Sequence, residues 1–350
     1  MPNLPVTFAC GLYDRVMPLY TGEVKPEGID LRFVVENAPR HLFDQMQGEG
    51  AFDASEMSLS EFICQAANPD WPYVALPVFP SRVFRHGYIV VNRKSGLTSP
   101  KDFEGKRIGV PNYFMTAAIY IRGLLRHDYG VDLSTITWVQ GELDRVGGHG
   151  KPPDLPLLGP VKIETNASGK SLTQLLEAGD ISATIGANVP ASLGVNPDIV
   201  RLFPNYRDLE EDHYRRTGIF PIMHVVALKR SLVEAHPFVA QSLYEAFLAA
   251  KNKAMASLRL KAASFSMLPW ARHEAEEMHQ LFGGDFWPYG LEANRRTLEA
   301  LVAYLVEQHL LATNIPVERL FLPVEWPPPP IAPPPPCGRS FRARETKRGH

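Results

Sequence analysis

The stretch KDFEGKRIGVPNYFMTAAIYIR, Lys101–Arg122, decides the fold. Its segment Arg107–Val110 predicts a buried strand, which Pro111 ends because proline cannot donate to a sheet ladder. A helix is expected from about Thr116. That helix begins just beyond the carboxyl end of a strand, where open α/β sheets bind ligands and where free helix N–H groups attract anions. The stretch therefore predicts an α/β protein with a ligand site beside it.

Strands and helices alternate on both sides of this stretch. Apolar, strand-like runs before it cover Val6–Cys10, Asp30–Val35, Tyr73–Phe79 and Gly87–Asn92. After it, the run Gly218–Leu228 is too apolar to form a surface strand. The alternation predicts a mostly parallel sheet covered by helices.

The order of these elements predicts two lobes. We expect residues 1–96 and 206–322 to form the first lobe and residues 97–205 to form the second. The chain then crosses between the lobes near 93–98 and again near 205–220. Two crossings make a hinge and leave a cleft, and the loops at the strand ends should face it.

Composition excludes several classes of protein. With 350 residues the chain is long enough for two lobes, and its net charge of -2 gives no indication of nucleic-acid binding. No apolar run reaches the roughly 18 residues of a membrane helix. The sequence enters its first strand at Val6 without a secretory signal, so we expect a cytoplasmic protein with no membrane partner. A homo-oligomer is compatible with the sequence.

Cysteine usage and spacing do not call for a metal or another cofactor. Cys10, Cys64 and Cys337 are too few and too scattered for a disulfide framework or a zinc site, and no HxH, HExxH or CxxC spacing occurs. The glycine- and proline-rich loop 141–160 is either a surface excursion or a lid. The proline-rich basic tail, 323–350, is expected to be disordered because it has little to bury.

Longer strings carry a family resemblance. The segment around Ser99–Pro111 resembles the opening of the second lobe in the type 2 periplasmic-binding-protein fold. Six strings, in order, resemble the 4,5-dihydroxyphthalate decarboxylase family over roughly residues 5–322. They are ACGLYDR (9–15), FDASEMSLSEF (52–62), PVFPSRVFRH (77–86), RIGVPNYFMTAAIYIRG (107–123), YRRTGIFPIMHVV (214–226) and DFWPYGLEANRRTLE (285–299).

The resemblance implies an α/β, two-lobed type 2 periplasmic-binding-protein-like fold with an interlobe cleft. It also implies a carboxy-lyase that converts 4,5-dihydroxyphthalate, a small aromatic dicarboxylate, to protocatechuate and CO2. The alternative is a solute-binding protein that delivers an aromatic or sulfonated anion to an ABC importer. A delivery protein needs a signal peptide or lipid anchor, and upstream sequence is the check on that point.

Arg82, Arg85 and His86 share one short loop after a strand. Arginine binds a carboxylate through a planar, two-pronged pair, so Arg82 and Arg85 are the expected substrate anchors. We expect His86 to act as acid or base. The alternative is a solvated turn whose arginines make ordinary surface ion pairs.

Glu56 and His224 are the candidate complements of His86, and the sequence does not assign the acid and the base. Glu56 follows a strand, so its carboxylate should face the cleft and accept a phenol proton. His224 interrupts an apolar strand near the return crossing, where the alternative is a satisfied core histidine. Ser58 is a further candidate for substrate binding, although a serine at a helix start is first a capping residue.

Two strand-end turns complete the candidate site. The N–H groups around Tyr113 and Thr116 are placed to hold a carboxylate, and the Tyr113 ring to stack on an aromatic substrate. Tyr13 and Arg15, after the first strand, have the same geometry.

Overall fold

The computed structural model of the chain describes residues 2–152, 155–260 and 266–324. The tail expected over 323–350 lies outside the described residues except for its first two positions, and so does Cys337. Within the described ranges, no helix is both long and apolar enough to cross a bilayer.

The first sheet has the strand order β2-β1-β3-β11-β4. β1 is parallel to β2 and to β3, whereas β11 is antiparallel to both β3 and β4. Every residue of β3 is buried, because helices or neighbouring segments cover both faces of the central strands. Its strands are β1 (Leu4–Cys10), β2 (Ile29–Val35), β3 (Ala54–Ser58), β4 (Tyr73–Arg82) and β11 (Ile222–Lys229).

The second sheet has the order β10-β5-β9-β6-β7-β8. β6 is parallel to β7 and β9, and β7 to β8, whereas β5 is antiparallel to β9 and β10. Both sheets are therefore mixed rather than mostly parallel, because the strands beside the crossings run against their neighbours. The strands are β5 (Val90–Asn92), β6 (Arg107–Val110), β7 (Thr137–Gln140), β8 (Ile163–Thr165), β9 (Ala183–Thr184) and β10 (Ile199–Arg201).

Helices surround both sheets, and the deciding stretch forms the strand and helix expected of it, β6 and α4. The α-helices are α1 (Met17–Tyr20), α2 (Pro39–Glu49), α3 (Leu59–Ala66), α4 (Thr116–His127), α5 (Leu172–Ala178), α6 (Tyr206–Thr217), α7 (Arg230–Ala235), α8 (Phe238–Leu260), α9 (Ala271–Phe282) and α10 (Arg295–Glu307). Short 3-10 turns cover His86–Tyr88, Arg93–Ser95, Pro100–Phe103, Leu133–Thr135, Glu292–Asn294 and Val317–Leu320.

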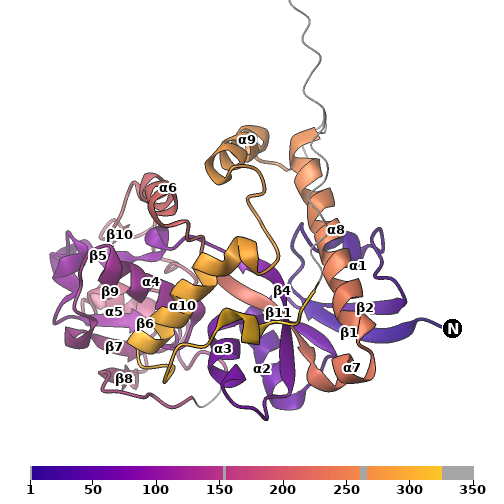
Figure 1. Ribbon diagram of the computed structural model, residues 1–350. Coiled ribbons are helices and arrows are strands. Elements are labelled where there is room, and N and C mark those ends of the chain that lie inside the picture. The colour runs from indigo at the N-terminus through magenta and orange to yellow at the C-terminus, as the bar shows by residue number, and fades with distance from the viewer. Residues whose placement is uncertain (1, 153–154, 261–265, 325–350) are drawn as a thin grey trace, which may run out of the picture.

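The chain passes between the sheets twice. β4 ends in the first sheet at Arg82 and β5 begins in the second at Val90, so the first crossing comes earlier than the expected 93–98. β5 cannot stay with the first lobe because its hydrogen bonds are to β9 and β10. The return runs from β10 through α6 to β11. Figure 1 shows the sheets side by side with α10 lying between them.

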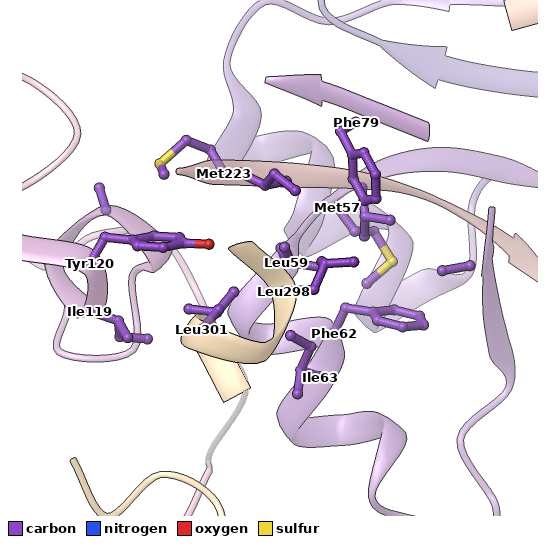
Figure 2. Packing of buried hydrophobic residues seen from close by; sticks show 14 of the residues in the cluster. Met57, Leu59, Phe62, Ile63, Phe79, Ile119, Tyr120, Met223, Leu298 and Leu301 are labelled. Carbon is purple, nitrogen blue, oxygen red and sulfur yellow. The ribbon is translucent and has the colours of Figure 1, made fainter. Parts of the chain in front are cut away.

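One apolar core continues from lobe to lobe beneath the cleft. Figure 2 shows Phe62 of α3, Tyr120 of α4 and Leu298 of α10 gathered in the same cluster. α4 and α10 approach closely at Gly123, where an added Cβ would lie 2.5 Å from the Tyr304 ring. Burying one leucine or phenylalanine side chain contributes about 1.5–3 kcal/mol. The shared core therefore stabilises the pairing of the lobes as well as each lobe.

Candidate active site

A cavity of about 510 Å³ lies between the lobes, within the size range of small-molecule sites. The interlobe cleft expected from the family resemblance is therefore present. The first lobe and the crossing contribute Tyr13, Asn37, Ala38, Pro39, Arg40, Phe43, Ser58, Glu61, Ser81, Val83, Arg85, Met223 and His224. The second lobe contributes Asn112, Met115, Thr116, Ala117, Glu142, Arg145, His149, Ala187 and Asn188.

A carboxylate and a histidine form a dyad at the wall of this cavity. The register of β3 and β11 pairs Glu56 with Val226, so His224 is its diagonal neighbour on the same face of the sheet. His224 Nδ1 lies 2.5 Å from Glu56 Oε1. The Phe43 ring stands edge-on to the imidazole with 5.0 Å between the ring centres. The dyad fixes the orientation of the imidazole, and no described residue hydrogen-bonds its other nitrogen, Nε2.

Glu56 is fully buried and is held by three further donors. Its Oε2 accepts the Gly11 N–H at 3.0 Å and the Cys10 thiol at 3.2 Å, and its Oε1 accepts the Tyr13 hydroxyl at 2.9 Å. Burial opposes ionisation, but the charge and hydrogen bond of His224, with Gly11 and Cys10, lower the pKa of Glu56 below its ordinary value. The carboxylate is therefore ionised at neutral pH, so the hydrogen bond that it makes with His224 is charge-assisted.

Arg85 brings a buried positive charge to the same cavity. Its side chain is almost completely buried, and among the described residues its guanidinium makes one hydrogen bond, to the Ala187 carbonyl at 3.3 Å. Its Nε has no partner, and no carboxylate in the part of the chain described lies within 4.0 Å of it. Burial lowers the pKa of Arg85 to about 10, so the group is still charged at neutral pH. Such a group is placed to receive an anion.

Arg82 lies outside the cavity and does not share this role. Its Nη2 donates to the Pro288 carbonyl at 2.9 Å and to the Asn294 side chain. The guanidinium also lies 5.4 Å from the centres of the Phe79 and Phe220 rings. The structure thus separates the two arginines that we expected to act together, because Arg82 is directed towards acceptors in the 288–294 segment.

His86 is also placed away from the Glu56–His224 dyad. Its ring packs against His213 and Phe203, behind the cleft, and its Nδ1 is 3.9 Å from a Glu210 oxygen. Burial, with the charges of His213 and Arg216, lowers its pKa to about 4. The expected partnership of His86 with Glu56 or His224 therefore does not occur in this arrangement.

Ser58 and Thr116 meet across the lobes at the cavity wall. Their hydroxyl oxygens are 3.1 Å apart, and Thr116 Oγ1 is also 2.8 Å from Ser60 Oγ. Ser58 begins α3, but its side chain does not cap the helix. Its hydroxyl is used between lobes, and the capping alternative does not describe it.

Tyr113 and Arg15 face other surroundings. The Tyr113 ring lies 3.7 Å beneath the Arg122 guanidinium, and its N–H donates to Gln140 Oε1 at 2.6 Å, so neither group is open to the cavity. The Arg15 guanidinium is stacked between the rings of Tyr13 and Trp287, 4.3 Å from each ring centre. Both residues support the site from behind, whereas Tyr13 lines it.

Arg145 is a cavity residue that sequence reasoning missed. It belongs to the loop 141–160, and no described residue pairs with its guanidinium. The loop reaches the first lobe, because the Lys151 N–H donates to Asp44 of α2 at 2.9 Å. These contacts favour the lid alternative for the loop. A loop without periodicity carries no signal by which Arg145 could have been found.

The other basic side chains of the cavity have acidic partners. Arg40 donates to Glu61 at 2.6 Å and to Asp44 at 2.8 Å, and His149 lies 3.0 Å from Glu142. Arg85 and Arg145 are therefore the lining cations without a described acidic partner. Their two positive charges suit a ligand with two negative charges.

Comparison with known proteins agrees with this geometry. The chain is 33% identical over 329 residues to a 4,5-dihydroxyphthalate decarboxylase from Comamonas testosteroni, covering 92% of this chain and 98% of the relative. It is 35% identical over 216 residues to a protein of the same name from Pseudomonas putida, covering 61% of this chain and 83% of that relative. No protein-family model matches the chain.

The fold is shared with a solved structure of low sequence similarity. The periplasmic aliphatic sulphonate binding protein SsuA from Escherichia coli aligns with a TM-score of 0.52 and 12% identity, covering 97% of this chain and 99% of that one. This likeness confirms the expected periplasmic-binding-protein-like fold and nothing about the ligand. Because the Comamonas relative is aligned over nearly its whole length, this chain belongs to the 4,5-dihydroxyphthalate decarboxylase family.

Proposed function

We propose that this protein decarboxylates 4,5-dihydroxyphthalate to protocatechuate and CO2. The observation that carries the proposal is one cavity that holds the unpaired Arg85 guanidinium and the His224 imidazole oriented by Glu56. Family membership supports the choice of substrate, since both decarboxylase relatives carry its name. The earlier expectations of a cytoplasmic location and of a homo-oligomer stay predictions.

The substrate is chemically suited to this reaction. Each ring hydroxyl is para to a carboxylate, so electron density from the oxygen reaches the ring carbon that carries the leaving group. That carbon accepts a proton, the bond to the carboxylate carbon breaks, and its electron pair restores the aromatic ring as CO2 departs. One proton is consumed and one CO2 is released, and the second carboxylate remains on the product.

His224 is the proposed proton donor. The ionised Glu56 orients its ring through Nδ1, and the ring is presented to the cavity with Nε2 without a described protein partner. In the proposed step the imidazolium gives its proton to the ring carbon and takes another from water afterwards. Glu56 does not touch the substrate in this proposal, and it acts by orienting the imidazole and stabilising its charge.

Arg85 and Arg145 are the proposed anchors for the two carboxylates. Arg85 provides a buried, planar donor pair from the crossing, and Arg145 provides an exposed one from the loop of the second lobe. The hydroxyls of Ser58 and Thr116 are the polar groups that line the junction of the lobes. Binding a dianion between arginines of opposite walls would draw the lobes together and exclude water.

The test is an assay of the purified full chain with 4,5-dihydroxyphthalate, following CO2 release and protocatechuate formation. We expect turnover by the unaltered protein and a loss of about 100- to 10,000-fold in kcat for His224→Asn. His273→Asn is the matched control, because His273 is an exposed residue of α9 far from the cavity in sequence and fold. Tight binding without CO2 release would contradict the proposal and favour a solute-binding protein.

A further inference from the structure

A second histidine cluster lies outside the interlobe cavity, where the two crossings meet. His86 comes from the turn after β4, Asp128 directly follows α4, and His213 belongs to α6. One donor atom from each residue lies within 4.8 Å of the other two. His213 Nδ1 is 2.8 Å from Asp128 Oδ2. Nothing in the proposed decarboxylation uses these three side chains.

The cluster contains a ring nitrogen without a hydrogen-bond partner, and a small cavity lies next to it. His86 Nδ1 is buried, and no hydrogen-bond partner for it exists among the residues described. A cavity of about 20 Å³ has both His86 and His213 among its lining residues. A buried polar atom without a partner is costly, and a cavity of this size holds one water molecule or one ion.

The carboxylates around the cluster favour a cation there. The His86 side chain is almost completely buried, and its Nδ1 lies 3.9 Å from a Glu210 oxygen. Asp128 Oδ2 accepts from Arg216 Nη2 at 3.0 Å as well as lying beside His213 Nδ1. Arg216 is half exposed and also pairs with Asp212, so it does not fill the cluster.

We propose that His86, Asp128 and His213 bind a zinc ion, with Glu210 as the fourth donor. Glu210 belongs to α6, and its Oε1 lies 3.9 Å from His86 Nδ1. Two imidazoles and two carboxylates balance the charge of a divalent ion and suit the nitrogen and oxygen preference of zinc. Bonds of about 2.0–2.1 Å put tetrahedral donors about 3.3 Å apart, so binding draws these side chains together by up to about 1.5 Å.

The site would join three elements that no single segment brings together. It would tie the first crossing, through His86, to the end of α4 in the second lobe and to α6 on the return crossing. Arg85 immediately precedes His86, so the ion would also fix the backbone that presents the cavity arginine. The sequence shows no metal motif because the donors are far apart along the chain, and only the fold gathers them.

Zinc binding to the untagged, chelator-treated full chain tests the proposal without reference to turnover. We expect one Zn²⁺ per chain by equilibrium dialysis and elemental analysis, an increase in Tm on adding ZnCl2, and the visible absorption of tetrahedral Co²⁺ when CoCl2 is used instead. Asp128→Asn and His213→Gln should each weaken zinc binding by more than about 100-fold, the upper range for loss of a merely supporting residue. His127→Gln is the matched control.

The control is informative because His127 is next to Asp128 in sequence, yet its ring pairs with Glu307 on the surface. It should keep the affinity, the stoichiometry and the cobalt spectrum of the unaltered protein. Failure of the unaltered chain to bind stoichiometric Zn²⁺ or Co²⁺ overturns the proposal, and a bound water then explains the small cavity. Unchanged binding in both Asp128→Asn and His213→Gln also overturns it. If one of these variants does not fold, the zinc stoichiometry and cobalt spectrum of the unaltered chain still test the proposal. His86→Gln, which should also weaken zinc binding, then takes the place of that variant.

Discussion

Arg82 ends strand β4 and Arg85 follows it by three positions, and the two are equally buried, each with 5% of its surface exposed. Their surroundings nevertheless assign them different roles. Arg82 has carbonyl and amide acceptors from the 288–294 segment and aromatic rings on its flanks. Arg85 has one long hydrogen bond and opens onto the interlobe cavity. Burial therefore does not separate a structural charge from a functional one, whereas the presence of partners does.

Glu56 refines that comparison. Its carboxylate has four hydrogen-bond partners among the described residues, so a test that looks only at partners would class it as a structural charge. One of its partners, however, is His224, which lines the cavity. A satisfied buried charge can thus act on the site through the group that it holds.

Among the substitutions that bear on this comparison, we expect Arg85→Met to have the largest effect on catalysis. Loss of a buried guanidinium that faces a substrate carboxylate costs about 2–5 kcal/mol, which is about a 30- to 5000-fold loss in kcat/KM. Arg85→Lys should recover only part, because an ammonium lacks the planar pair of donors. Steady-state kinetics with 4,5-dihydroxyphthalate measures both, and Tm should change little. Full activity in Arg85→Met would remove Arg85 from the site.

Glu56→Gln should lower kcat by about 100-fold. The uncharged amide offers Nδ1 of His224 a weaker hydrogen bond than the carboxylate does, so the ring that donates the proton is held less firmly. Steady-state kinetics measures the loss, and an unchanged kcat would mean that the dyad contributes only packing. Asp212→Asn is a suitable control, since that carboxylate is exposed and pairs with Arg216.

The same substitution has a consequence for stability. Because the pKa of Glu56 is lowered in the folded state, its ionisation stabilises the fold above its ordinary value of 4.5 and this contribution is lost as the pH falls through the lower folded value. Below pH 4.5 the Tm of the unaltered protein should therefore fall more steeply than that of Glu56→Gln. Thermal unfolding across pH 3–7 (roughly) measures the difference. Parallel curves would contradict it.

Arg82→Met should show the opposite pattern to Arg85→Met. It removes the Arg82 donor from the buried Asn294 side-chain oxygen and one of the two donors of the Pro288 carbonyl, which Asn294 Nδ2 still reaches at 3.0 Å. The expected cost is about 1–3 kcal/mol in the free energy of unfolding. Urea denaturation measures this cost. The kcat/KM of the folded variant should stay within a few-fold of the unaltered value. Lost turnover with unchanged stability would show that Arg82, too, serves the substrate.

The smallest effect is expected for Arg145→Gln. Its guanidinium is exposed, so solvent weakens its attraction for an anion to about 1 kcal/mol, which is about a fivefold rise in KM. High salt should reduce the difference from the unaltered protein, whereas it should hardly affect the Arg85 variant. A loss as large as that of Arg85→Met would mean that the loop closes over the bound substrate and buries Arg145.

The sequence by itself determined the family, the two-lobed α/β fold and several residues of the cavity. Local sequence patterns were enough to predict β6 and α4, since an apolar run and the break at Pro111 involve only residues that are neighbours along the chain. Tyr13, Ser58 and Thr116 were chosen for their places near strand ends and do line the cavity, because the carboxyl ends of parallel strands gather at one edge of a sheet.

Only the tertiary structure decided the rest. Which of Arg82 and Arg85 finds acceptors depends on segments 100 or more residues away, from Ala187 to Asn294. The pairing of Glu56 with His224 needs the register of two strands from distant parts of the chain, and the position of His86 needs the return of α6. Sequence patterns report preferences of neighbours along the chain, whereas the partner of a buried charge is set by packing between segments that meet only in the folded protein.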